Sequence, residues 1–213
     1  MPLNYPLLHD IIFYVMYLAA GLATFVISER MIFFAVTLRH ARALEPLLIA
    51  GDGDVAKVAR QFENSMSVPA QALRRMMDAR WRIHNRHDQE DISEAIYLSL
   101  KAQLQHRLWM LDTVVTAAPL LGLLGTIFGI IETFTALAHS GISDPSAVSA
   151  GIGTALFATA LGIAIALYGL LFFNLFQERI ERIGEYLRII ILHAGLATGV
   201  GDVGDMPAAA GKP

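Results

Sequence analysis

The chain has 213 residues, of which 55% are apolar and 16% are charged, and its formal net charge at pH 7 is −3. A mean hydropathy of +0.51 is high for a water-soluble fold, and basic residues that are not interleaved with aromatics argue against a nucleic-acid interface. The absence of cysteine excludes a disulfide framework and a thiolate metal site.

The N-terminal part contains the first apolar stretch. Residues 1–10 carry no basic residue, which argues against a cleaved signal peptide, because such peptides open with a positive segment. Residues 11–28 are uncharged, and about 20 apolar residues suffice to cross a bilayer as a helix. We assign residues 11–36 as the first transmembrane helix, with a buried core helix as the alternative.

Residues 37–107 are predicted to form a helical cytoplasmic domain. One helix is expected over about 40–50, where it ends at a Gly-Asp-Gly-Asp turn, and a second is expected over about 55–64. Ser67 and Pro69 open a third helix.

A long helix is predicted to enter the membrane from this domain. Asp88 is expected to cap its N-terminus, and the helical pattern then continues unbroken over 89–138. Pro119 has no N–H to donate to the helical ladder, so we expect it to kink this helix.

The second and third transmembrane helices are assigned to residues 108–138 and 149–178, because neither run nor the segment between them contains Lys or Arg. Backbone groups in hydrocarbon must pair within their own segment, so the two runs are predicted to form a helical hairpin joined by residues 139–148. Residues 179–196 are expected to continue as an amphipathic cytoplasmic helix. Residues 197–213 lack a periodic face and are predicted to be disordered.

The basic residues orient these spans. Most of the 16 lie between Arg39 and Arg107, and Arg179, Arg182 and Arg188 follow the last apolar run. Because cytoplasmic segments carry the excess of Lys and Arg, we place the N-terminus and the 139–148 loop outside.

Both predicted hairpin helices carry small residues at spacings of three and four. These positions share a helix face, and a face without bulk lets two helix backbones approach closely. The predicted packing positions are Gly122, Gly125 and Gly129 on the first helix, and Gly151, Ala155, Ala158 and Gly162 on the second.

Two stretches within the hairpin carry a family resemblance. APLLGLLGTIFGIIETF (118–134) and GIGTALFATALGIAIAL (151–167) resemble the two signature helices of the ExbB/TolQ family. The resemblance implies an all-α integral membrane protein with three transmembrane helices and a helical cytoplasmic domain, located in the bacterial inner membrane with its N-terminus in the periplasm. It implies no enzyme activity, metal or cofactor.

The same resemblance implies an assembly and a function. The chain would form a homopentameric ring in the lipid bilayer, with the second and third spans lining a proton channel. An ExbD/TolR-type single-span partner would occupy the pore, and the ring would energise TonB-dependent transport through a TonB- or TolA-type protein. The alternative is an oligomeric membrane scaffold that does not conduct.

Four residues are candidates for the proton pathway. Thr126 and Thr159 align with the threonines that line the pore in the family; a threonine bonded to its own helix is the structural alternative. Thr154 stands where the family carries a Glu, whereas Glu132 lies near the same depth on the neighbouring helix. An intramembrane charge points to a functional site, so Glu132 is predicted to replace that carboxyl, with snorkelling to the outer interface as its alternative.

The inner end of the hairpin carries ionic residues. Arg107 and Asp112 are predicted to lie at a cytoplasmic mouth and to pair there with Arg179 or Arg182. The alternative is that all four are interfacial anchors. His84, His87 and Asp88 superficially suggest a metal site, but this spacing is a weak signal, and no metal site is predicted.

Overall fold

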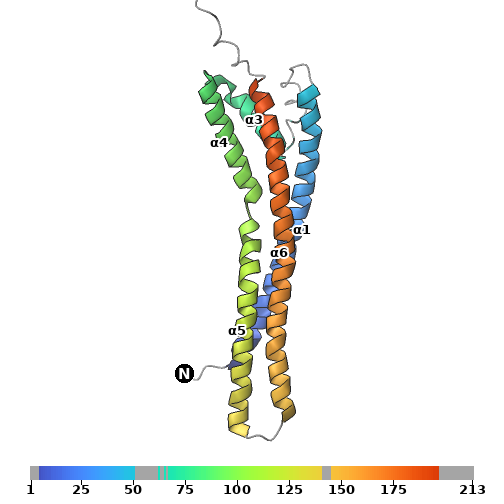
Figure 1. Cartoon of the computed structure of the whole chain (residues 1–213), viewed down its shortest axis with the longest axis vertical. Helices are drawn as coiled ribbons and strands as arrows, with labels where there is room; N and C mark the ends of the chain where they lie inside the picture. The colour runs from blue at the N-terminus through green and yellow to red at the C-terminus, as the bar shows by residue number, and fades with distance from the viewer. Residues whose placement is uncertain (1–4, 51–61, 63–64, 66, 141–144, 197–213) are drawn as a thin grey trace, which may run out of the picture. The chain divides into compact units, whose positions relative to one another are not determined.

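The computed structural model describes residues 5–50, 62, 65, 67–140 and 145–196. Three of the helices found there are long and apolar enough to cross a membrane, over Leu7–Leu44, Leu108–Ala138 and Pro145–Gly195. This finding confirms the predicted all-α class with three spans. In chain order (Figure 1) the elements are α1 (Tyr5–Ala50), α3 (Val68–Ala79), the 3-10 helix η1 (Arg80–Arg82), α4 (Arg86–Gln105), α5 (Leu108–Ser140) and α6 (Pro145–Leu196).

The chain divides into two compact units. The first is formed by Met1–Met31 with Arg107–Phe176, and the second by Ile32–His106 with Gln177–Pro213. Each unit contains part of α1 and part of α6, since both of these helices continue from one unit into the other.

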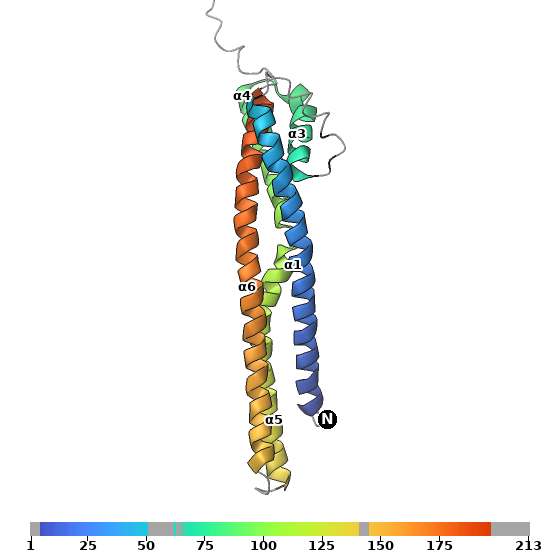
Figure 2. The ribbon, with the colours of Figure 1, turned by 90° about the vertical axis from the view of Figure 1, so that its right-hand side faces the viewer.

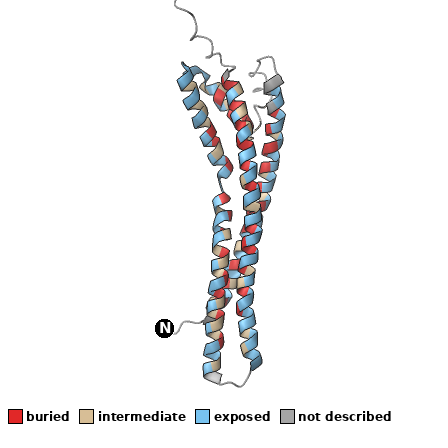
Figure 3. Ribbon diagram, viewed as in Figure 1, coloured by how far each residue is buried: buried red, intermediate tan, exposed pale blue. Residues whose placement is uncertain are grey.

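In the first unit α5 and α6 run antiparallel and side by side, as the two views in Figures 1 and 2 show. The N-terminal half of α1 packs against this pair. Its Phe13 ring stacks on the Phe157 ring of α6, with centroids 6.3 Å apart, and Ile12 lies against Gly125 of α5. Many of the outward positions on α5 and α6 are exposed (Figure 3), and they include large apolar side chains such as Leu120, Leu123 and Leu167.

The second unit has a different kind of core. It buries many large aliphatic and aromatic side chains, whereas the first unit fully buries only a few, such as Met16 and Leu111, and its α5–α6 seam consists mainly of glycine, alanine and threonine. Burial of bulky apolar surface stabilises a fold in water, whereas small residues let helices pack closely in lipid. The fully buried large residues of the second unit include Phe34, Leu44, Leu73, Met76, Leu100, Leu104, Ile180, Ile183, Leu187 and Ile190.

Several helix boundaries differ from the predicted ones. The first span and the helix expected over 40–50 are one continuous helix, α1, because no residue between them breaks the pattern. The break between the last two spans is shorter than expected, since α5 reaches Ser140 and α6 begins at Pro145. The helix predicted over 55–64 and the tail 197–213 fall almost entirely outside the described residues.

The predicted unbroken helix over 89–138 is wrong. Helix α4 ends at Gln105 and α5 begins at Leu108, and Arg107 between them has a positive φ of 72°. A non-glycine residue in the left-handed region is unfavourable on its own. The Arg107 side chain forms an ion pair with Glu29 of α1, with Nη1 3.3 Å from Oε1, and this contact favours the turn. Helix α5 itself continues through Pro119.

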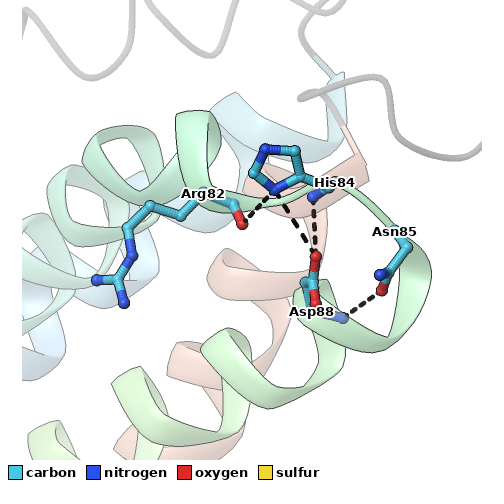
Figure 4. A network of polar contacts seen from close by, with 4 residues as sticks. All are labelled: Arg82, His84, Asn85 and Asp88. Carbon is cyan, nitrogen blue, oxygen red and sulfur yellow. Dashed lines mark hydrogen bonds and ion pairs between the residues drawn. The ribbon is translucent and has the colours of Figure 1, made fainter.

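The N-terminus of α4 is capped by Asn85 and not by the predicted Asp88 (Figure 4). Asn85 Oδ1 accepts a hydrogen bond from the Asp88 N–H at 2.7 Å, and the Asp88 carboxylate accepts one from the His84 N–H at 3.1 Å. Each acceptor satisfies a backbone donor near the helix start. The His84 ring lies 3.1 Å from the Arg82 carbonyl and 3.9 Å from the same carboxylate. These side chains therefore serve the cap, and no group able to hold a metal occurs among the described residues.

Candidate proton-pathway site

The seam between α5 and α6 is closest where two glycines face each other. A Cβ on Gly162 would lie 2.5 Å from the Ala118 carbonyl oxygen and 3.0 Å from the Gly122 Cα. A Cβ on Gly122 would lie 2.8 Å from the Ala158 carbonyl oxygen. Since real Cβ atoms essentially never come within 3.0 Å of such atoms, both positions require glycine at this helix separation.

The remaining small residues extend the same seam toward the loop end of the hairpin. A Cβ added to Gly125 would lie 2.8 Å from the Ala158 methyl group, and one added to Gly129 would lie 2.9 Å from the Ala155 methyl group. Gly151 lies against the Thr133 side chain, whose hydroxyl donates to the Gly129 carbonyl at 2.8 Å. The small faces of the two helices therefore pack on each other within one chain.

Two of the four predicted pathway residues meet in this seam. Thr126 and Thr159 are both half-buried, and their hydroxyls form a hydrogen bond with each other. Thr126 Oγ1 lies 3.1 Å from the carbonyl oxygens of Gly122 and Ala155, and Thr159 Oγ1 lies 3.1 Å from that of Gly122. Two hydroxyls have only two protons to donate, so these four contacts cannot all be made at once.

Glu132 and Thr154 do not join the hydroxyl pair. Thr154 is exposed and donates to the Ala150 carbonyl at 2.9 Å on its own helix. Glu132 is half-exposed, and at 3.6 residues per turn it lies about 120° around α5 from Thr126. The structure thus places the two threonines together and Glu132 on another side of α5.

A residue that the sequence prediction missed lies between α1 and α5. His9 is only 9% exposed, its Nε2 has no hydrogen-bond partner among the described residues, and it lies 3.3 Å from the position of a Cβ on Gly129. Its ring is edge-on to Phe13, with centroids 5.0 Å apart. The sequence carried a signal for this position, because His9 shares helical spacing with the buried residues Ile12 and Met16.

Charged residues gather at the other end of the first unit. The Glu29 carboxylate forms an ion pair with Arg30, whose Nε lies 3.1 Å from Oε2, and it accepts a hydrogen bond from Arg107 Nη1 at 3.3 Å; Arg30 is only 4% exposed. A single carboxylate thus binds two guanidinium groups.

The ionic partners differ from those predicted for the cytoplasmic mouth. Arg107 pairs with Glu29, and Arg182 pairs with Glu178 one turn earlier on α6, at 2.5 Å. Asp112 and Arg179 are exposed.

Comparison with known proteins agrees with the resemblance seen in the two signature helices. The MotA/TolQ/ExbB proton channel family matches residues 64–189. The biopolymer transport protein ExbB of Aquifex aeolicus (strain VF5) is 36% identical over 82 residues, which are 38% of this chain and 55% of the relative. ExbB of Helicobacter pylori (strain J99 / ATCC 700824) is 35% identical over 92 residues, covering 43% of this chain and 63% of the relative.

The chain matches the ExbB relatives over only part of their length. ExbB of Pseudomonas putida is 37% identical over 71 residues, 33% of this chain and only 22% of the relative. The chain therefore spans between about a fifth and just under two thirds of the length of these three relatives. The family match, in contrast, covers more than half of this chain and includes α5 and most of α6. The chain is a multi-pass membrane protein that belongs to the MotA/TolQ/ExbB proton channel family.

Proposed function

We propose that the chain is the ring-forming subunit of a proton-driven motor in the bacterial inner membrane, which energises an envelope process such as TonB-dependent transport. The observation that carries this proposal is the family match over residues 64–189, which includes both signature helices and the Thr126–Thr159 pair. Relatives in two bacteria are named biopolymer transport proteins. In this proposal the chain conducts protons and transmits work without catalysing a reaction.

The proposed assembly is a homopentamer whose α5 and α6 helices surround an ExbD/TolR-type single-span partner. The exposed apolar side chains on α5 and α6 support it, because a helical hairpin with this much uncovered apolar surface needs lipid or protein around it. They include Leu120, Leu123, Ile127, Leu156, Leu167 and Leu171. A TonB- or TolA-type protein would receive the work, and the N-terminus would lie in the periplasm.

The proposed proton path runs past the Thr126–Thr159 pair. A hydroxyl both donates and accepts, so the two can hydrogen-bond to water or to a protonated carboxyl without adding a fixed charge. Their half-buried position and their competing hydrogen bonds support this role. Glu132 and Thr154 would contribute on the outer side, and Arg107, Asp112, Arg179 and Arg182 at the cytoplasmic mouth.

Proton flux in liposomes tests the pathway. The protein is reconstituted with its single-span partner, a potassium diffusion potential is applied, and an internal pH dye is followed. We expect partner-dependent flux that is strongly reduced in Thr126→Val/Thr159→Val, because valine keeps the shape but removes both hydroxyls. The matched control is Thr135→Val, since Thr135 is exposed on α5 and donates to its own helix at 2.7 Å.

The non-conducting scaffold predicts a different result. It is favoured by the hydrogen bonds from both hydroxyls to main-chain carbonyls, which are also the contacts of purely structural threonines. A scaffold would assemble normally and show no partner-dependent flux in any variant. Glu132→Gln tests the outer carboxyl separately, and flux equal to that of the wild type would remove Glu132 from the path.

A further inference from the structure

His9 is a buried imidazole whose Nε2 has no hydrogen bond in the described structure. It is nine-tenths buried, and the absence of a side chain at Gly129 gives it the space it occupies. Buried polar atoms nearly always have a partner, and an ionisable group inside a membrane protein points to a functional site. The contact between α1 and α5 therefore holds a nitrogen that needs a donor or an acceptor.

Glu132 follows Gly129 by less than one helical turn of α5, and no ion pair between it and His9 is present in the described structure, so its side chain would have to turn toward His9 to supply a partner. Ile12 lies against Gly125 and His9 against Gly129, so α1 and α5 are antiparallel. Glu132 comes three residues after Gly129, about 4.5 Å further along α5 and about 60° around it. Helical side chains lean toward the N-terminus of their own helix. In two antiparallel helices this lean directs His9 and Glu132 along the helix axes toward the same level, and a change of the Glu132 rotamer could close the remaining gap.

Few other charged groups surround this position. Asp10 is exposed on α1, and the part of α6 that belongs to the first unit carries no Asp, Glu, Lys or Arg among its described residues. An isolated carboxylate or imidazolium would be unfavourable in such apolar surroundings. A carboxyl and an imidazole that share one proton have no net charge in either arrangement, whether the proton is on oxygen or on nitrogen.

We propose that His9 and Glu132 form a site that binds one proton between α1 and α5. In the site the proton lies between a carboxyl oxygen of Glu132 and Nε2 of His9. This inference deepens the proposed function, on which it rests for the use of the proton but not for the existence of the pair. The site lies on a different side of α5 from the Thr126–Thr159 pair.

Nitrogen-15 NMR of histidine-labelled full-length protein in lipid bilayers tests the pair. The His9 resonances are identified by their loss in His9→Gln. In the wild type we expect Nε2 to show a hydrogen bond to a carboxyl, and in Glu132→Gln we expect the resonance to move to that of an uncharged imidazole without this bond. The matched control is Glu178→Gln, which removes a carboxylate that pairs with Arg182 and should leave His9 unchanged.

The possible outcomes distinguish a failure of the His9–Glu132 site from a failure of the proposed motor function. An Nε2 resonance that is the same in wild type and Glu132→Gln overturns the proposal, since Glu132 would then not be its partner. Glu132→Asp retains a carboxyl with a shorter reach and should weaken the coupling without abolishing it, which keeps the test open if the Gln variant does not fold. If the His9 resonance depends on Glu132 but the protein conducts no protons, the proposed motor function is wrong and the His9–Glu132 site is supported. If the protein conducts protons but the His9 resonance does not depend on Glu132, only the His9–Glu132 site is wrong.

Discussion

Gly162→Ala tests whether the α5–α6 seam depends on direct contact between helix backbones. The new Cβ would lie 2.5 Å from the Ala118 carbonyl oxygen, whereas ordinary contact begins at 3.4 Å. The nearest atoms belong to the backbone and cannot rotate away. The helices must therefore separate locally by about 0.9 Å, the difference between these two distances.

The expected cost has two parts. Overpacking of a closely packed site costs about 1–3 kcal/mol. Separation of the helices also weakens the hydrogen bond from Thr159 to the Gly122 carbonyl, which adds about 0.6 kcal/mol in a membrane. Alanine favours the helix over glycine by up to about 1 kcal/mol. The variant must therefore be compared with a Gly→Ala change at an open position, which gains this helix propensity without a steric clash.

Gly153→Ala on α6 and Gly21→Ala on α1 are the matched controls, because a Cβ at either position meets nothing within 4 Å. We expect Gly162→Ala to be less stable than both by about 2–4 kcal/mol. The measurement is SDS titration in mixed micelles, followed by far-ultraviolet circular dichroism and tryptophan fluorescence. Equal stability of Gly162→Ala and Gly153→Ala would refute the argument that backbone contact determines this seam.

Three further predictions concern other contacts. Gly151→Ala should destabilise the hairpin, because the new methyl group would press on the Thr133 hydroxyl. In a double-mutant cycle, the variant that also carries Thr133→Ala should be about 1 kcal/mol more stable than the sum of the two single effects predicts. Strictly additive effects would contradict this prediction. Asn85→Ala should cost about 1 kcal/mol and speed hydrogen exchange in the first turn of α4, whereas Asn85→Ser should retain the cap. Arg107→Gly should be more stable than Arg107→Ala by about 1 kcal/mol in denaturant titration, because both lose the ion pair with Glu29 but only glycine accepts a φ of 72° without strain.

The three spans and the packing faces were predictable from sequence for a clear physical reason. Hydrocarbon imposes a minimum apolar length on every crossing helix, so the spans are visible in composition alone. Close helix packing requires residues without bulk at helical spacing, and Gly122, Gly129 and Gly162 meet this requirement locally. The hydrogen bond between Thr126 and Thr159 was not predicted from the sequence, because it depends on how closely α5 and α6 pack.

Other features depend on residues that are distant in the sequence. The stretch around His106 and Arg107 consists of residues that a helix tolerates, so the pattern predicted one long helix. The turn there pairs Arg107 with Glu29, 78 positions earlier in the chain. The predicted N-cap of α4 lies three residues too late because Asn85 and Asp88 are both good capping residues, and only the backbone geometry distinguishes them.

By itself the sequence determined the class of protein, the number of crossings, the face that each hairpin helix uses for packing and the family. The first three depend on local composition and periodicity, because each crossing segment must satisfy the surrounding hydrocarbon by itself. The family follows from the resemblance of two motifs to known signature helices. The tertiary structure alone decided where the helix breaks, which carboxylate binds Arg107 and which side chain occupies the space above Gly129. These depend on which distant residues meet, and no local pattern encodes the contact of His9 with a glycine that lies 120 positions away.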